Sequence, residues 1–178
     1  MSSEQLSMNV LDVSHDDLVA IGCRWLRNSI GCGVVVTELV SYANETADVL
    51  GWKESTSILI ECKTSLSDFR ADAKKPFRQR PDSGVGEHRF FLTPRGLLSD
   101  VELPEGWGLL EWDGSQVRRS RAVFKGNVVP SAVFEPNRRA ETTILCSIAR
   151  RLIDGDKNAR TYCASQRTRR AEKLTTPH

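Results

Sequence analysis

The amino-acid sequence predicts an α/β fold in which helices flank a central mixed β-sheet. The first observation is the order of its periodic segments: a helical pattern, three strand-like runs, a second helical pattern and a further strand. The second is composition, since 39% of the 178 residues are hydrophobic and 27% are charged, as in ordinary globular domains. We expect a single domain over residues 1–155 and a basic, flexible tail over residues 156–178.

The first half of the chain contains the patterns of one helix and three strands. Residues 16–28 repeat apolar side chains at helical spacing, after Ser14 as N-cap with Asp17 three residues on, and before Gly31. Polar stretches between the runs that follow predict turns and therefore a meander. The three strands are expected over residues 34–41, 47–52 and 57–63.

The second half begins with a capping signal, Ser65-Leu-Ser-Asp68, for a helix that continues to about Lys75. Pro76 stops or kinks this helix. The polar stretch 78–87 is either a mobile loop that closes over a nucleic-acid strand or only a connector. Later elements are expected over residues 88–93, 107–112 and 116–124 as strands and over residues 137–153 as a helix.

Three charged side chains lie in or beside the predicted core strands. Glu61 and Lys63 end one strand and point to the same face, because side chains alternate along a strand. Asp48, in the preceding strand, can converge on the same point. A charge beside a core strand is costly unless it is paired or holds a metal. A cross-face ion pair and a functional site both satisfy this condition. Glu38, in the strand before, is either exposed at an edge or functional.

The segment from Val34 to Phe91 resembles the PD-(D/E)xK nuclease superfamily, and most closely its small DNA-repair and phage-borne members. The likeness extends over roughly residues 15–113. Ala47 departs from the family motif, which usually has Pro there, but that Pro carries no chemistry. The matching stretches are Val34-Val-Val-Thr-Glu38, Ala47-Asp48, Ile60-Glu61-Cys-Lys63-Thr-Ser65, Asp68-Phe69…Asp72…Lys74, Gly84 to Pro94 and Pro104 to Glu111.

The resemblance implies a restriction-endonuclease-like core and a catalytic site formed by Asp48, Glu61, Lys63 and Glu38. Asp48, Glu61 and the backbone carbonyl of Cys62 would bind Mg²⁺, with Mn²⁺ as an alternative. Lys63 would orient or deprotonate the attacking water, with its pKa lowered beside the metal ions. Glu38 would complete the acidic site.

DNA is the expected partner. The first 89 residues carry a net charge of −3 and the remaining 89 a net charge of +5, which suits an acidic site beside a surface for a polyanion. The family reading also keeps Asp68 and Asp72 near the site, whereas their spacing equally fits a solvated helix face. For the arginines of residues 116–124, protection of an edge strand is the alternative. The candidate DNA contacts are Lys74, Arg78, Arg80, Arg118, Arg119 and Arg121.

These observations predict a metal-dependent nuclease that hydrolyses DNA in repair, recombination or phage DNA processing. One alternative is a non-cleaving DNA-binding or accessory protein on the same fold. Another is a structural protein whose acids form ion pairs. Five cysteines without C-x-x-C spacing favour free thiols, and the absence of a signal peptide or long apolar run predicts a cytoplasmic protein without membrane contact. The sequence is compatible with a homodimer and does not determine the oligomeric state.

Overall fold

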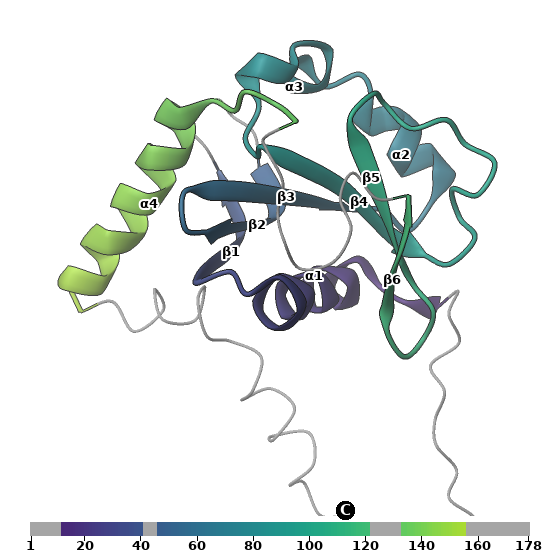
Figure 1. Cartoon of the computed structure of the whole chain (residues 1–178), viewed down its shortest axis with the longest axis horizontal. Coiled ribbons are helices and arrows are strands. Elements are labelled where there is room, and N and C mark those ends of the chain that lie inside the picture. The colour runs from purple at the N-terminus through teal and green to yellow at the C-terminus, as the bar shows by residue number, and fades with distance from the viewer. Residues whose placement is uncertain (1–11, 41–45, 122–132, 156–178) are drawn as a thin grey trace, which may run out of the picture.

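The computed structural model describes residues 12–40, 46–121 and 133–155 (Figure 1). Its centre is one six-stranded mixed sheet in the order β1-β2-β3-β4-β5-β6. The first three strands form an antiparallel meander, β4 and β5 continue it in parallel, and β6 turns back antiparallel to β5. The predicted α/β class with a mixed sheet is therefore confirmed. The strands are β1 (Val34–Val40), β2 (Thr46–Lys53), β3 (Thr56–Cys62), β4 (His88–Pro94), β5 (Trp107–Trp112) and β6 (Val117–Arg121).

Helices cover both faces of this sheet. Figure 1 shows α1 beneath the sheet, with α2, α3 and α4 on its other side. The parallel step from β3 to β4 contains α2 and α3, as such a crossover requires. The helices are α1 (His15–Trp25), which continues as a π-helical turn (Leu26–Ile30), α2 (Leu66–Asp72), α3 (Pro76–Gln79) and α4 (Arg138–Ile153), with a 3₁₀ turn at Pro81–Ser83. Among the described residues, no helix is both long and apolar enough to span a membrane.

Alternation along β3 divides the core into two layers. Ile58, Ile60 and Cys62 pack toward α1, and all three side chains are fully buried, as the sequence predicted. Leu59 packs on the opposite face, with residues of α2 and α4. Glu61 continues the row of Leu59, so the strand turns its charged end toward α2 and α3.

The predicted caps fix where α1 and α2 begin. The Ser14 hydroxyl accepts the N–H of Asp17 at 3.1 Å, and the Asp17 carboxylate accepts the N–H of Ser14 at 3.2 Å, which completes a capping box. The Ser65 hydroxyl accepts the N–H of Asp68 at 3.2 Å. Gly31 ends the π-helical turn with a φ of 84°, a left-handed conformation that glycine adopts without strain.

The helix expected to reach Lys75 instead ends at Asp72. Lys75 has an extended backbone, and Pro76 opens the separate helix α3, at the first position, where its missing N–H costs nothing. The polar stretch 78–87 is therefore partly helical. Its far end is fixed by the buried Arg89, whose guanidinium donates to the carbonyl oxygens of Gly86, Pro81 and Gly84.

Other differences from the predicted elements are local. Glu38 has a φ of 52°. In the β1–β2 ladder its neighbours Thr37 and Leu39 are paired with β2, whereas Glu38 is not. The strand expected over residues 116–124 is described as β6 up to Arg121; its last residues and the predicted tail, 156–178, lie outside the described residues. Cys23, Cys32, Cys62 and Cys146 are free thiols.

Candidate functional site

The charged end of β3 is buried under α2 and α3. Only 1% of Glu61 and 3% of Lys63 is exposed. The Lys63 Nζ lies 3.3 Å from Glu61 Oε2 and 3.3 Å from Asp72 Oδ1. The two residues thus share a face, as their spacing predicted, and the ammonium bridges a carboxylate of β3 to one of α2.

Asp72 is drawn into this site by the packing of α2. Phe69 lies one helical turn earlier, and its ring packs edge-on against Phe91 with centroids 4.9 Å apart. Residues three apart share a helix face, so the same docking turns Asp72 inward and leaves it 1% exposed. A buried carboxylate requires partners, and the sequence segment after α2 supplies them.

Lys75 and Arg78 neutralise the two buried carboxylates. The Lys75 Nζ lies 2.7 Å from Asp72 Oδ1 and 4.0 Å from Glu61 Oε2. The Arg78 Nε lies 2.6 Å from Asp72 Oδ2, and its Nη2 lies 2.9 Å from Glu61 Oε1. Its guanidinium also lies over the Trp107 ring, 4.7 Å from the centroid. We call Glu61, Lys63, Asp72, Lys75 and Arg78 the ion cluster.

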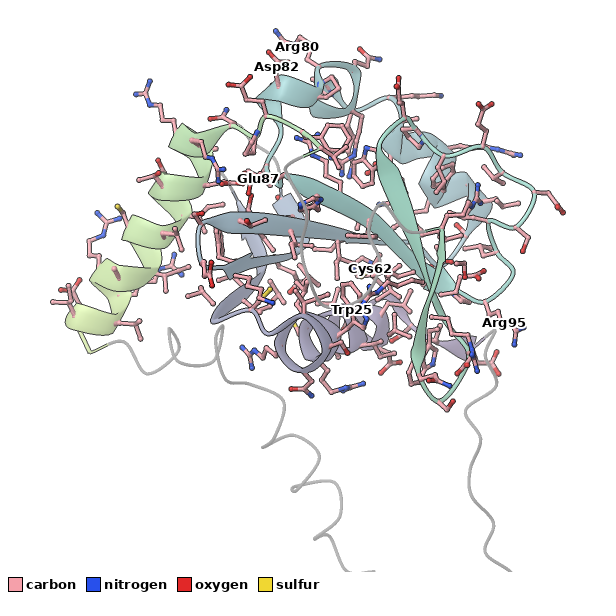
Figure 2. The ribbon with its side chains drawn as sticks, in the orientation of Figure 1. Trp25, Cys62, Arg80, Asp82, Glu87 and Arg95 are labelled. Carbon is pink, nitrogen blue, oxygen red and sulfur yellow. The ribbon has the colours of Figure 1, made fainter. Side chains whose placement is uncertain are left out.

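Asp48 reaches the same end of the sheet from β2. The β2–β3 ladder ends at the pair Val49 and Ile60, so Asp48 stands one position further, opposite Glu61. Its Oδ2 accepts the N–H of Cys62 at 2.8 Å, and its Oδ1 lies 3.6 Å from His15 Nε2. The carboxylate therefore ties β3 to the first turn of α1. Figure 2 shows Cys62 on the side of the sheet that faces α1.

The ion cluster shifts its members' pKa values in different directions. Burial raises the pKa of Glu61 to about 7; Arg78 opposes this shift and the Asp48 charge adds to it. Burial also raises the pKa of Asp72, but Arg78 and Lys63 outweigh it and hold that pKa below its ordinary value. Burial lowers the pKa of Lys63, yet the carboxylates of Glu61 and Asp72 dominate and raise it. At neutral pH Lys63 and Asp72 are charged, whereas Glu61 titrates.

The remaining predicted site residues are not members of the ion cluster. Glu38 is exposed on β1. Lys74 is exposed just after α2, and Figure 2 shows Arg80 beside α3, directed away from the sheet. Lys74 and Arg80, both predicted DNA contacts, are thus exposed to solvent.

The arginines of β6 have partners within the protein. Arg118 Nε lies 2.6 Å from Asp113 Oδ2. The Arg119 guanidinium lies 5.4 Å from the centroid of the Trp25 ring. Arg121 donates to the carbonyl oxygens of Val101, at 2.8 Å, and Leu98. Arg121 thus fixes the connection between β4 and β5. Arg78, also a predicted DNA contact, belongs to the ion cluster.

The donor chemistry of this site fits a hard divalent cation. Among residues 12–40, 46–121 and 133–155, no group of three His, Cys, Asp or Glu side chains is arranged to hold a metal ion. Mg²⁺, however, needs only one or two protein carboxylates, with the remaining positions filled by water or substrate oxygens. Within the described chain, the buried Glu61 Oε1 accepts no hydrogen bond, although Arg78 is its ion-pair partner. A buried carboxylate oxygen that accepts no hydrogen bond is suited to a metal ligand once Arg78 moves away from it.

Sequence reasoning missed three features of the site: the contact of His15 with Asp48, and the roles of Lys75 and Arg78 in the ion cluster. The i, i+3 spacing of Asp72 and Lys75 was visible, but it indicates a surface pair as readily as a buried one. Arg78 was assigned to a loop. Arg78 is a buried ion-pair partner only because Asp72 is buried, and the sequence alone does not show the burial of Asp72.

Comparison with known proteins gives a structural neighbour. No family model matches the chain, and no curated protein matches it significantly. Among solved structures, the SPO1766 protein from Silicibacter pomeroyi, which is of unknown function, is similar with a TM-score of 0.56 and 25% sequence identity. The alignment covers 79% of this chain and 90% of that chain. This likeness supports the fold and carries no information on activity.

Proposed function

We propose that this protein is a metal-dependent nuclease that hydrolyses phosphodiester bonds in DNA, in repair, recombination or phage DNA processing. The observation that carries the proposal is the buried Glu61–Lys63 pair at the end of β3, with Asp48 opposite it at the end of β2. The order of α1, the β1–β3 meander, α2 and β4 is also that of the PD-(D/E)xK core which the sequence resembles.

The proposed metal ligands are Asp48, Glu61 and the carbonyl of Cys62. Mg²⁺ or Mn²⁺, when bound, supplies a water activated for attack and a charge sink for the phosphate oxygens. Metal binding requires an ionised Glu61, which its raised pKa opposes below about pH 7. Asp48 keeps one oxygen on the Cys62 N–H, which holds its carboxylate at the strand end.

Lys63 is the proposed electrostatic catalyst. Its Nζ is held between Glu61 and Asp72 at 3.3 Å from each, so the ammonium needs no reorganisation when charge develops on the phosphate. The raised pKa keeps Lys63 charged in the metal-free protein. During cleavage the Lys63 ammonium would neutralise negative charge that develops on the phosphate, and a bound cation nearby would lower the Lys63 pKa and allow proton transfer.

A second candidate is a non-cleaving DNA-binding or accessory protein on the same fold. The observation in its favour is the neutralisation of Glu61 and Asp72 by Lys75 and Arg78, since paired acids have less need of a metal. Fold alone does not decide between the two, because one fold hosts many functions.

The test is incubation of the full-length protein with labelled single-stranded, duplex and branched DNA and with RNA, in Mg²⁺, Mn²⁺ or EDTA. Cleavage of DNA is expected with the metals only, and Glu61→Gln and Lys63→Met should abolish it. Glu105→Gln, at an exposed position remote in sequence from the cluster, is the control that should keep it. Binding without cleavage under every condition favours the accessory protein. Equal cleavage by wild type and Glu61→Gln refutes this site.

A further inference from the structure

When Glu61 is ionised, the ion cluster and Asp48 are electrically balanced without a metal ion. Three carboxylates, those of Asp48, Glu61 and Asp72, face three cationic side chains. A divalent cation added to this set would leave a charge of +2 in a largely buried site. Such an excess is costly in a low-dielectric environment, so either a protein cation leaves or an anion arrives.

Two protein cations lie against the oxygens that a metal would use. Arg78 Nη2 stands 2.9 Å from Glu61 Oε1, and Lys75 Nζ stands 4.0 Å from Glu61 Oε2. A Mg²⁺ ion sits about 2.1 Å from a ligating oxygen and keeps its own water shell. The guanidinium and the hydrated cation cannot both occupy the space in front of Oε1.

We propose that Lys75 and Arg78 form a cationic latch that competes with a divalent cation for Glu61 and releases it to the metal when a nucleic-acid phosphate binds. The latch rests on the proposed function and adds regulation to the same site: metal and DNA bind cooperatively. A phosphate balances the added charge, and it is a strong bidentate partner for the arginine that leaves Glu61.

The places of the three cationic residues in the fold favour Lys75 and Arg78 over Lys63 as the groups that leave Glu61. Lys63 directly follows β3, and its backbone N–H donates to the carbonyl oxygen of Leu92 in β4 at 3.0 Å. Lys75 is 42% exposed in the extended link between α2 and α3, and Arg78 belongs to a helix of only four residues.

A purely structural ion cluster makes a different prediction. If Arg78 only compensates buried charge, its removal takes one cationic partner from Glu61 and Asp72 and destabilises the fold without improving metal binding. If Arg78 is a latch, its removal frees Glu61 for a cation. Metal affinity therefore separates the two roles, independently of activity.

The experiment measures Mn²⁺ binding to full-length protein by electron paramagnetic resonance of the free ion. Lys75→Met and Arg78→Met are compared with Arg95→Met and Arg150→Met, each of which removes one positive charge at an exposed position outside the ion cluster. Each variant is titrated alone and with a phosphorothioate DNA oligonucleotide that resists hydrolysis. Circular dichroism checks folding, and the partly exposed Lys75 position keeps the test valid if Arg78→Met fails to fold.

Without DNA, Lys75→Met and Arg78→Met should bind Mn²⁺ at least about tenfold more tightly than wild type, because a unit charge a few ångströms away is worth more than 1.4 kcal/mol. The two control variants should match wild type. The oligonucleotide should bring wild type close to the latch variants. Mn²⁺ binding of equal strength in all five proteins refutes the latch and leaves the proposed function standing. The absence of Mn²⁺ binding in every protein, with and without DNA, refutes both.

Discussion

Replacing Glu61 by Gln should remove a pH-dependent loss of stability from the metal-free protein. Burial raises the pKa of Glu61 from 4.5 to about 7, and Arg78 only partly opposes the shift. The folded protein therefore holds this proton more tightly than the unfolded chain does. The contribution of Glu61 to stability is fully present below pH 4.5 and is lost as the pH rises through 7.

The magnitude follows from the difference between the two pKa values. At 1.36 kcal/mol per pH unit, the rise from 4.5 to about 7 corresponds to roughly 3 kcal/mol at full ionisation. About 2.5 kcal/mol of this lies between pH 5 and pH 8. Glutamine has nearly the same shape as glutamate and does not titrate, so Glu61→Gln should gain that amount relative to wild type over the same interval.

Urea unfolding in EDTA gives the free energy of unfolding of Glu61→Gln and of wild type at pH 5 and at pH 8. The gain is the amount by which the difference between the two proteins changes from pH 5 to pH 8. Glu105→Gln, which neutralises an exposed acid, is the matched control and should follow wild type at both pH values. If the free energy of unfolding of Glu61→Gln differs from that of wild type by the same amount at pH 5 and pH 8, Glu61 is not held in the buried, desolvated state described here.

Three further outcomes are expected from the geometry of the site and the charge of the chain. Asp72→Asn should lower the free energy of unfolding at pH 7 by about 3 kcal/mol, because Lys63 and Arg78 lose one of their two buried carboxylate partners. The exposed Asp68→Asn should change it by less than about 0.5 kcal/mol. Asp48→Asn should stabilise the metal-free protein by roughly 0.5–2 kcal/mol, because it removes the repulsion between Asp48 and Glu61 while the amide oxygen can still accept the Cys62 N–H. In thermal melts, Mg²⁺ should also stabilise this variant less than it stabilises wild type. Removal of residues 156–178 should flatten the slope of log DNA affinity against log salt by roughly 0.9 per lost phosphate contact.

Each of these outcomes can fail in a recognisable way. Equal destabilisation by Asp68→Asn and Asp72→Asn in urea would mean that the buried partners of Asp72 contribute nothing. A lower melting temperature of Asp48→Asn in EDTA, with a full response to Mg²⁺, would make Asp48 a structural residue. An unchanged salt slope after truncation, measured by fluorescence anisotropy, would leave the tail without a role in DNA binding.

The sequence by itself determined the order of the elements and the two faces of β3. Helical and strand periodicities and the caps at Ser14 and Ser65 are local signals, and the structure contains both caps. The alternation that separates Ile60 and Cys62 from Glu61 and Lys63 is also local, because it depends only on the geometry of a strand. These features needed no knowledge of what packs against the strand.

Only the tertiary structure decided which charges meet. Asp72 follows Phe69 by three residues, and the docking of that ring on Phe91 turned a helix face that the sequence left open into a buried one. The burial of Asp72 then makes Arg78 an internal ion-pair partner and not a surface residue, although its charge is the same in either position. The physical reason is that the energy of a charge depends on its surroundings, and the surroundings of Asp72 and Arg78 come from strands that are distant in the sequence.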